Sequence, residues 1–165
     1  PGHGRSLVDT HLEPSEVDVS LDILRKNDFI PFEMLKTESL MMLAHIVYPK
    51  IDNEVATYSK KINKIIRKEL LFKGLILTDD ISMKALSENL NIIIKKSYSA
   101  GCDVILHCSG KLDEVKNFYG CVKKIKKKYY DYFINDILNL KLQKQNILNI
   151  KKILSSDNVI KNQCN

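Results

Sequence analysis

The sequence has few cysteines and no apolar run that approaches the length of a membrane-spanning segment. A helix that crosses a bilayer needs about 20 predominantly apolar residues, so we expect no integral membrane protein. Hydrophobic residues make up 44% of the chain and charged residues 28%, a balance that excludes an intrinsically disordered protein. The 165 residues suffice for one domain with a sizeable core.

The 4 cysteines include no C-x2-C pair, and no histidine stands at zinc-finger spacing, so we predict no structural zinc site. A start methionine and a secretory signal are also missing. We therefore expect a chain that begins inside a longer protein, resides in the reducing cytoplasm and forms no disulfides. Cys102 and Cys108 are predicted to be apolar residues that flank a buried strand. No metal or organic cofactor is predicted.

An excess of positive charge is absent from most of the chain. Residues 1–110 carry 14 basic and 15 acidic side chains, whereas residues 111–165 carry 12 basic and 5 acidic ones. A nucleic-acid-binding protein is basic over its binding surface, so we expect neither nucleic acid nor a membrane as the main partner. The lysine cluster at 123–128 is interpreted as a solvated helix face, with phosphate or anionic lipid contact as the alternative.

Short apolar runs alternate with amphipathic segments along the chain. Runs of strand length indicate strands buried on both faces, and apolar residues at helical spacing indicate helices that pack on such strands. This order predicts an α/β fold with parallel strands and right-handed crossovers. The predicted strands are 40–47, 74–78 and 103–108, and the predicted helices are 15–27, 59–71, 83–100, 112–127 and 130–154.

Polar side chains stand where these strands end, which is where parallel α/β folds gather their functional groups. Asp79 and Asp80 follow the strand at 74–78, and His45 and His107 lie near the ends of the other two. Backbone donors at a strand end can hold Asp79 as an ionised carboxylate, which suits a glycosidase nucleophile or a metal site. The alternative is structural, because Asp80 or its neighbours could simply cap the following helix.

The opening loop carries a second candidate pair, Asp9 and His11, separated by one residue. In extended backbone these side chains project to the same side. The carboxylate can then fix the tautomer of the imidazole and leave its other nitrogen free for proton transfer. The alternative interpretation is a polar surface loop.

Four segments hold most of these candidate residues. They are PGHGRSLVDTH at 1–11, MLAHIVYP at 42–49, KGLILTDDISMKAL at 73–86 and AGCDVILHC at 100–108. In order and spacing they resemble family 3 glycoside hydrolases, and among these the bacterial β-N-acetylglucosaminidases of peptidoglycan recycling. The resemblance covers residues 1–127, and its one mild departure is Thr78, where the family usually has serine.

The resemblance implies a (β/α)8 barrel and hydrolysis of terminal β-linked N-acetylglucosamine with retention of configuration. It places Asp79 as the nucleophile, His11 as the general acid/base and Asp9 as the partner of His11. His45 is a candidate for contact with the sugar, although packing in the core is the alternative. The implied substrates are N-acetylglucosamine-containing muropeptides.

The family's Lys-His-Phe motif and the earlier barrel strands are absent from the sequence. A full (β/α)8 barrel needs about 250 residues. We therefore expect an incomplete barrel: the catalytic loop after strand five, plus strands six to eight and their helices. This assigns residues 1–128 to the C-terminal half of the catalytic domain and residues 129–165 to a basic helical extension.

The partner expected on this reasoning is the missing N-terminal half of the barrel. Three alternatives to an intact hydrolase stay open. The chain could be a truncated non-catalytic remnant, one chain of a split enzyme, or a phosphorylase variant of the family.

Overall fold

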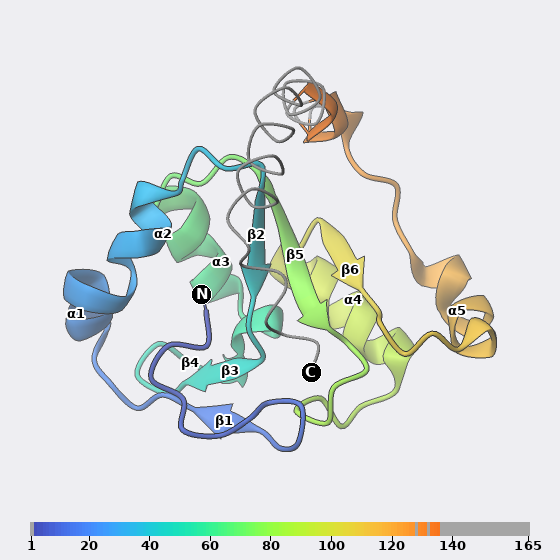
Figure 1. Cartoon of the computed structure of the whole chain (residues 1–165), viewed down its shortest axis with the longest axis horizontal. Coiled ribbons are helices and arrows are strands. Elements are labelled where there is room, and N and C mark those ends of the chain that lie inside the picture. Colours follow the sequence, from blue (N-terminus) through green and yellow to red (C-terminus); the bar gives the residue numbers. More distant parts are fainter. Residues whose placement is uncertain (1, 128, 132, 136–165) are drawn as a thin grey trace, which may run out of the picture.

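The central sheet consists of three parallel strands in the order β2-β5-β6 (Figure 1). They are β2 (Leu40–Leu43), β5 (Leu75–Asp80) and β6 (Val104–Leu106). The computed structural model describes residues 2–127, 129–131 and 133–135. Within these residues the predicted α/β fold with parallel strands is confirmed.

A second sheet of three strands has the order β1-β3-β4. Its strands are β1 (Ser15–Glu16), β3 (Ile46–Tyr48) and β4 (Asp52–Val55). The prediction of one strand over 40–47 is therefore wrong. The chain leaves the central sheet after Leu43, turns at Ala44 and His45, and enters the second sheet at Ile46. An apolar run cannot reveal this turn, because the residues of both strands are apolar.

The helical segment between β4 and β5 begins where the sequence predicts. The hydroxyl of Ser59 accepts a hydrogen bond from the N–H of Ile62 and caps α3 (Lys60–Lys64), which continues as the π-helical η3 (Ile65–Glu69). The segment ends at Leu71, which has a φ of 57°, as the predicted range 59–71 requires. Glycine is needed at position 74, just before β5, because a Cβ there would lie 2.6 Å from the carbonyl oxygen of Glu38 and closer still to that of Ser39.

The next two helices are shorter than predicted. Helix α4 (Leu90–Ala100) begins after Asn89, whose side chain accepts a hydrogen bond from the N–H of Asn91, so the predicted start at residue 83 is wrong. It ends at Gly101, whose φ of +113° suits glycine. Helix α5 (Leu112–Phe118) passes into a short 3₁₀ turn, Tyr119–Cys121. Residues 129–131 and 133–135 are helical, and the rest of the predicted extension lies outside the described residues.

Three short helical pieces precede β2. They are α1 (Leu21–Ile23), the π-helical η1 (Leu24–Asp28) and α2 (Ile30–Met34), which has Pro31 in its first turn. The helix predicted over 15–27 is thus only partly confirmed, because Ser15–Glu16 forms a strand. Within the described part of the chain, no helix has the length and apolar character needed to cross a membrane.

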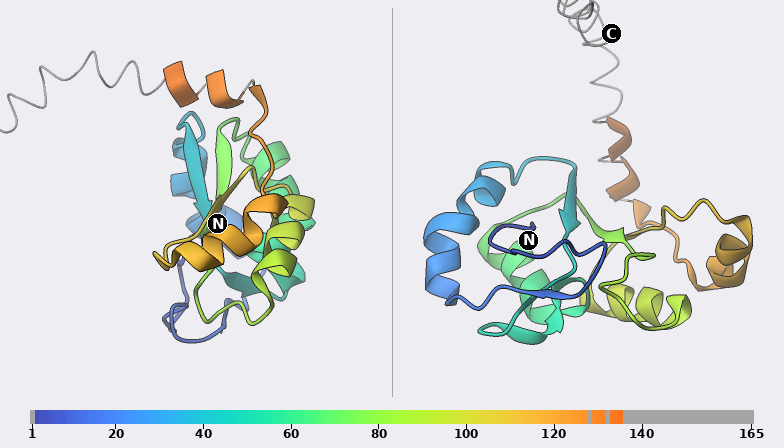
Figure 2. Two further views of the ribbon diagram at one scale, coloured as in Figure 1. Left: turned by 90° about the vertical axis from the view of Figure 1, so that its right-hand side faces the viewer. Right: turned by 60° about the horizontal axis from the view of Figure 1, so that its bottom comes forward.

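The main core lies on one face of the central sheet. Met41, Leu43 and Ile76 on the strands are buried there together with Ile62 and Ile66 of the α3–η3 segment. Helix α4 packs beside α3 (Figure 2). On the opposite face of β2, Leu40 and Met42 are 42% and 43% exposed. One face of the sheet is therefore well covered, whereas the other leaves large apolar side chains in contact with solvent.

Candidate active site

Polar residues from three parallel strands meet at the carboxyl-terminal edge of the central sheet. His45 follows β2, Asp79 and Asp80 end β5, and His107 and Cys108 follow β6. The strands are parallel, so their carboxyl ends share one edge. The sequence-based expectation that these positions gather at one place agrees with this arrangement.

Asp79 is half-buried at this edge. Its Oδ1 accepts a hydrogen bond of 2.8 Å from the backbone N–H of Asp80. The carboxylate is thus oriented by the backbone of the strand that carries it, while part of its surface remains accessible. This geometry suits a nucleophile that must be fixed and still reachable.

A bulge re-aims the end of β5. The register between β5 and β6 shifts between Leu77 and Asp80, and in this interval the N–H of Leu106 donates to Thr78 Oγ1 at 3.0 Å. Thr78 is fully buried. Bulges of this kind turn side chains away from the regular alternation of a strand. Thr78 thus accepts this hydrogen bond with its own hydroxyl oxygen.

Asp80 joins the loops after β5 and β6. Its Oδ1 accepts from the N–H of Ser82 at 3.0 Å and from the N–H of Cys108 at 2.9 Å, and its Oδ2 accepts from the Ser82 hydroxyl at 2.6 Å. Partial burial opposes ionisation, but these hydrogen bonds and the nearby His107 outweigh it and hold the pKa of Asp80 below its ordinary value. Asp80 therefore links the loop after β5 to the loop after β6 through its hydrogen bonds with Ser82 and Cys108, and it does not cap a helix.

His45 lies beneath the site and has no access to its surface. The residue is 1% exposed, its Nδ1 is 2.7 Å from Thr57 Oγ1, and its Nε2 is 3.0 Å from the carbonyl oxygen of Asp80. Both ring nitrogens are engaged inside the protein, so the expectation that His45 contacts the sugar is not supported by this geometry. Thr57 was not among the predicted site residues, since it lies in a short 3₁₀ helix, Ala56–Tyr58, away from any strand end.

The opening loop brings Asp9 and His11 into direct contact. Asp9 Oδ1 accepts from the backbone N–H of His11 at 2.9 Å and lies 2.8 Å from His11 Nδ1. The backbone hydrogen bond first, and then the ring, hold the pKa of Asp9 below its usual value. The side chains of His11 and Asp9 are 71% and 59% exposed. The pairing expected from their spacing is present, on the protein surface.

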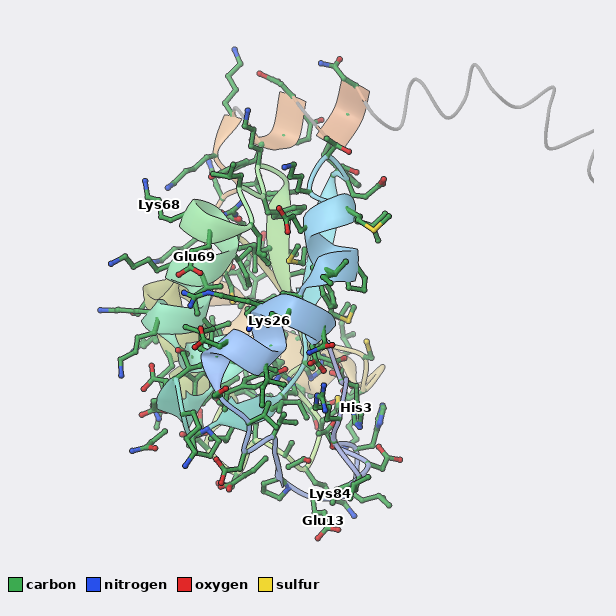
Figure 3. All side chains as sticks on the ribbon, turned by 90° about the vertical axis from the view of Figure 1, so that its left-hand side faces the viewer. His3, Glu13, Lys26, Lys68, Glu69 and Lys84 are labelled. Carbon is green, nitrogen blue, oxygen red and sulfur yellow. The ribbon has the colours of Figure 1, made fainter. Side chains whose placement is uncertain are left out.

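This loop lies at the same end of the molecule as the segment after β5, as Figure 3 shows for the labelled Glu13 and Lys84. Its base is tied down by Tyr48, which donates to the carbonyl oxygen of Gly2 at 3.0 Å, and by Arg5, which donates to both carboxylate oxygens of Asp28 at 2.9 Å. Among the described residues, no hydrogen bond or ion pair joins the Asp9–His11 pair to Asp79.

The side chain of His107 is buried and packs against side chains of α5. Its Nε2 donates to Glu114 Oε2 at 3.0 Å, its ring meets Phe118 edge-on with centroids 5.0 Å apart, and its side chain is 6% exposed. The partner Glu114 lies on α5, so a strand-end pattern does not reveal it. In the described part of the chain, no group of three or more histidine, cysteine, aspartate or glutamate side chains is arranged to hold a metal ion.

A known protein family matches most of the chain, including the edge of the sheet that carries these residues. The family described as "Glycosyl hydrolase family 3 N terminal domain" matches residues 1–139. The chain belongs to this family. Its α/β architecture with parallel strands is that of the TIM-barrel-like domain of family 3.

Relatives within family 3 are beta-hexosaminidases. The enzyme of Stenotrophomonas maltophilia (strain K279a) is 38% identical over 117 residues, which are 68% of this chain and 35% of that protein. The enzyme of Haemophilus influenzae is 36% identical over 115 residues, 66% of this chain and 33% of that protein. The chain thus spans about a third of the length of the curated relatives it matches.

Solved family 3 structures share the fold. The native NagZ of Neisseria gonorrhoeae has a TM-score of 0.69 and 31% identity, covering 82% of this chain and 39% of that one. NagZ of the same organism in complex with N-trifluoroacetyl-D-glucosamine has a TM-score of 0.68 and 32% identity, covering 80% and 40%.

The family match also overturns one expectation. The sequence was expected to be the C-terminal half of the catalytic domain, whereas the region that matches residues 1–139 is the family's N-terminal domain. The motifs alone gave the order of the strands but not the boundaries of the domain that contains them.

Proposed function

We propose that this chain carries the reacting groups of a retaining β-N-acetylhexosaminidase that releases terminal β-linked N-acetylglucosamine from peptidoglycan fragments in the cytoplasm. The observation that carries the proposal is the geometry of Asp79. Its carboxylate is oriented by the Asp80 N–H at 2.8 Å, at the carboxyl edge of a parallel sheet. The Asp9–His11 pair lies on a loop at the same end of the molecule.

In the first step, an oxygen of Asp79 attacks the anomeric carbon while the bond from that carbon to the leaving oxygen breaks. His11 gives a proton to the leaving oxygen. Its Nδ1 faces Asp9 at 2.8 Å, so Nε2 is the nitrogen available for transfer. In the second step His11 takes a proton from water, and the hydroxide equivalent displaces Asp79 from the sugar.

The rest of the sugar pocket comes from outside this chain in our proposal. The curated relatives are about three times as long as the part that matches, and Leu40 and Met42 leave the far face of β2 uncovered. Further strands would continue the sheet, cover this face and close a barrel around the edge that holds Asp79. Residues 1–128 then form part of the barrel, and residues 129–165 form an extension to it.

The test is hydrolysis of a chromogenic β-N-acetylglucosaminide by the full-length protein. Asp79→Ala should abolish turnover, and a slow fluorinated substrate should label Asp79 covalently in the unchanged protein. Asp113→Ala is the matched control, since that side chain is 93% exposed. Turnover that survives Asp79→Ala would reject the assignment.

A second variant isolates the acid/base role. His11→Ala should slow substrates with poor leaving groups far more than substrates with good ones, since a good leaving group departs without a proton. Equal losses for both substrates would contradict the role of His11.

Phosphorolysis is the alternative supported by one feature, the imidazole acid/base. A histidine repels an incoming phosphate less than a carboxylate does. Sugar 1-phosphate formed in phosphate buffer would identify this activity, and free sugar alone would favour hydrolysis. The absence of both products would favour a non-catalytic remnant or a chain that needs a separate partner.

A further inference from the structure

The end of β5 has no backbone partner on its β2 side. On one side, the ladder with β2 runs only as far as the pair Leu43–Thr78, because β2 ends there. On the other side, the register with β6 is interrupted between Leu77 and Asp80. Pairing with β6 resumes at Asp80–Leu106, and the N–H of Ile81 donates to the carbonyl oxygen of Leu106 at 2.9 Å. The residue proposed as nucleophile thus lies where the backbone hydrogen bonds stop on the β2 side alone.

We infer that His45 and Thr57 form a buried positioning pair that replaces the missing backbone bond and fixes the strand end that carries Asp79. The inference rests on the proposed role of Asp79 as nucleophile. His45 is a positioning residue: it touches the backbone of Asp80 and not the substrate.

The direction of each hydrogen bond follows from the chemistry of the partners. A carbonyl oxygen can only accept, so His45 Nε2 donates to Asp80 O across 3.0 Å. In the neutral ring, Nδ1 then has no hydrogen and accepts from the hydroxyl of Thr57 across 2.7 Å. Thr57 thereby selects the tautomer that can hold Asp80.

The surroundings keep this arrangement neutral and dry. Thr57 is 0% exposed and His45 is 1% exposed. Burial lowers the pKa of His45, against the opposing influence of the Asp80 carbonyl and of the Asp79 and Asp80 carboxylates. The thiol of Cys102 donates to the carbonyl oxygen of Thr57 at 3.6 Å and ties the pair to the start of β6.

One residue transmits the effect to the nucleophile. The carbonyl oxygen of Asp80 accepts from His45 Nε2 at 3.0 Å and from the N–H of Met83 at 3.1 Å, and the N–H of Asp80 holds the carboxylate of Asp79 at 2.8 Å. A shift of Asp80 therefore moves the donor that orients Asp79. A displacement of about 1 Å at a reacting group can reduce a rate about 10²-fold.

Two pairs of variants in the full-length protein test the inference. Thr57→Val removes the hydroxyl at nearly constant volume, and Thr57→Ser retains it. His45→Gln keeps an amide donor near the position of Nε2, and His45→Asn is too short to reach Asp80. We expect kcat to fall about tenfold in Thr57→Val and about 10²-fold in His45→Asn, with KM changed less than about threefold. The serine and glutamine variants should recover most of the lost kcat.

A spectroscopic measurement tests the same contact without relying on turnover. Imidazole ¹⁵N shifts of the unchanged protein should show the hydrogen of His45 on Nε2. A hydrogen on Nδ1 would overturn the inference, as would variants that raise KM or unfold more easily while kcat stays unchanged.

The proposed function and the positioning role of His45 and Thr57 can be rejected separately. If Asp79→Ala retains turnover, the proposed function is wrong, and the inference falls with it as a statement about catalysis. If Asp79→Ala is inactive and His45→Asn and Thr57→Val are both fully active, only the positioning role is wrong.

Discussion

Single residues at the candidate site differ in how firmly the fold holds them. Asp80 receives three hydrogen bonds and Asp79 one, whereas Asp9 and His11 hold each other at the surface. A nucleophile gains from being fixed, because its attack has one productive direction. An acid/base that serves two steps must reach two different oxygens. The exposed pair suits that requirement.

Asp80→Ala should destabilise the protein by about 1–2 kcal/mol, because it removes the acceptor shared by Ser82 and Cys108 at a partly solvated position. The free energy of unfolding in urea measures this loss. Ser82→Ala removes only the hydroxyl donor and should cost less. Equal losses in the two variants would mean that the bridge to Cys108 contributes nothing.

The Asp9–His11 contact should weaken as Asp9 becomes protonated at low pH. The pKa of Asp9 lies below its usual 3.8 in the folded protein, so the ionised contact is present above that pH and is lost as the pH falls through the lowered pKa. The carboxyl ¹³C shift of Asp9 should titrate with a midpoint below 3.8. His11→Ala should move that midpoint up, and a midpoint unchanged by the variant would contradict the contact.

At the scale of elements, the sequence predicts which segments form strands better than it predicts the residues at which those strands begin and end. The runs at 74–78 and 103–108 correspond to β5 and β6, because continuous apolar residues suit strands buried on both faces. The run at 40–47 was misjudged, since periodicity does not show that His45 turns inward to bond Asp80. Contacts between distant segments, such as His45 with Thr57, leave no local pattern.

The connection into β5 depends on a glycine for packing. Gly74→Ala should destabilise the protein by about 1–3 kcal/mol, because the added methyl group would meet the backbone carbonyls of Glu38 and Ser39, which cannot rotate away. Urea unfolding provides the measurement. Gly120→Ala is the matched control, since nothing lies within 4 Å of a Cβ at that position. Equal stabilities of the two variants would contradict the close approach.

For the whole molecule, the exposed face of β2 is the main difference from a complete barrel, in which this face would be covered. Met42 is 43% exposed on that face, and Met34, on α2, is 77% exposed. If further strands cover β2 in the full-length protein, Met42→Lys buries a charge and should cost at least about 2 kcal/mol of stability. Met34→Lys should be nearly neutral. Thermal unfolding of the two variants tests this, and equal melting temperatures would show that the face stays open.

The Asp9–His11 pair spans only three consecutive residues, and both of its hydrogen bonds are made inside that tripeptide. The internal geometry of the pair therefore does not depend on contacts with the rest of the loop. For the proposed mechanism, assembly of the site then depends on one distance, the separation between this pair and Asp79. Evolution could change the length or course of the loop, and with it the leaving groups admitted, without rebuilding the proton-transfer chemistry.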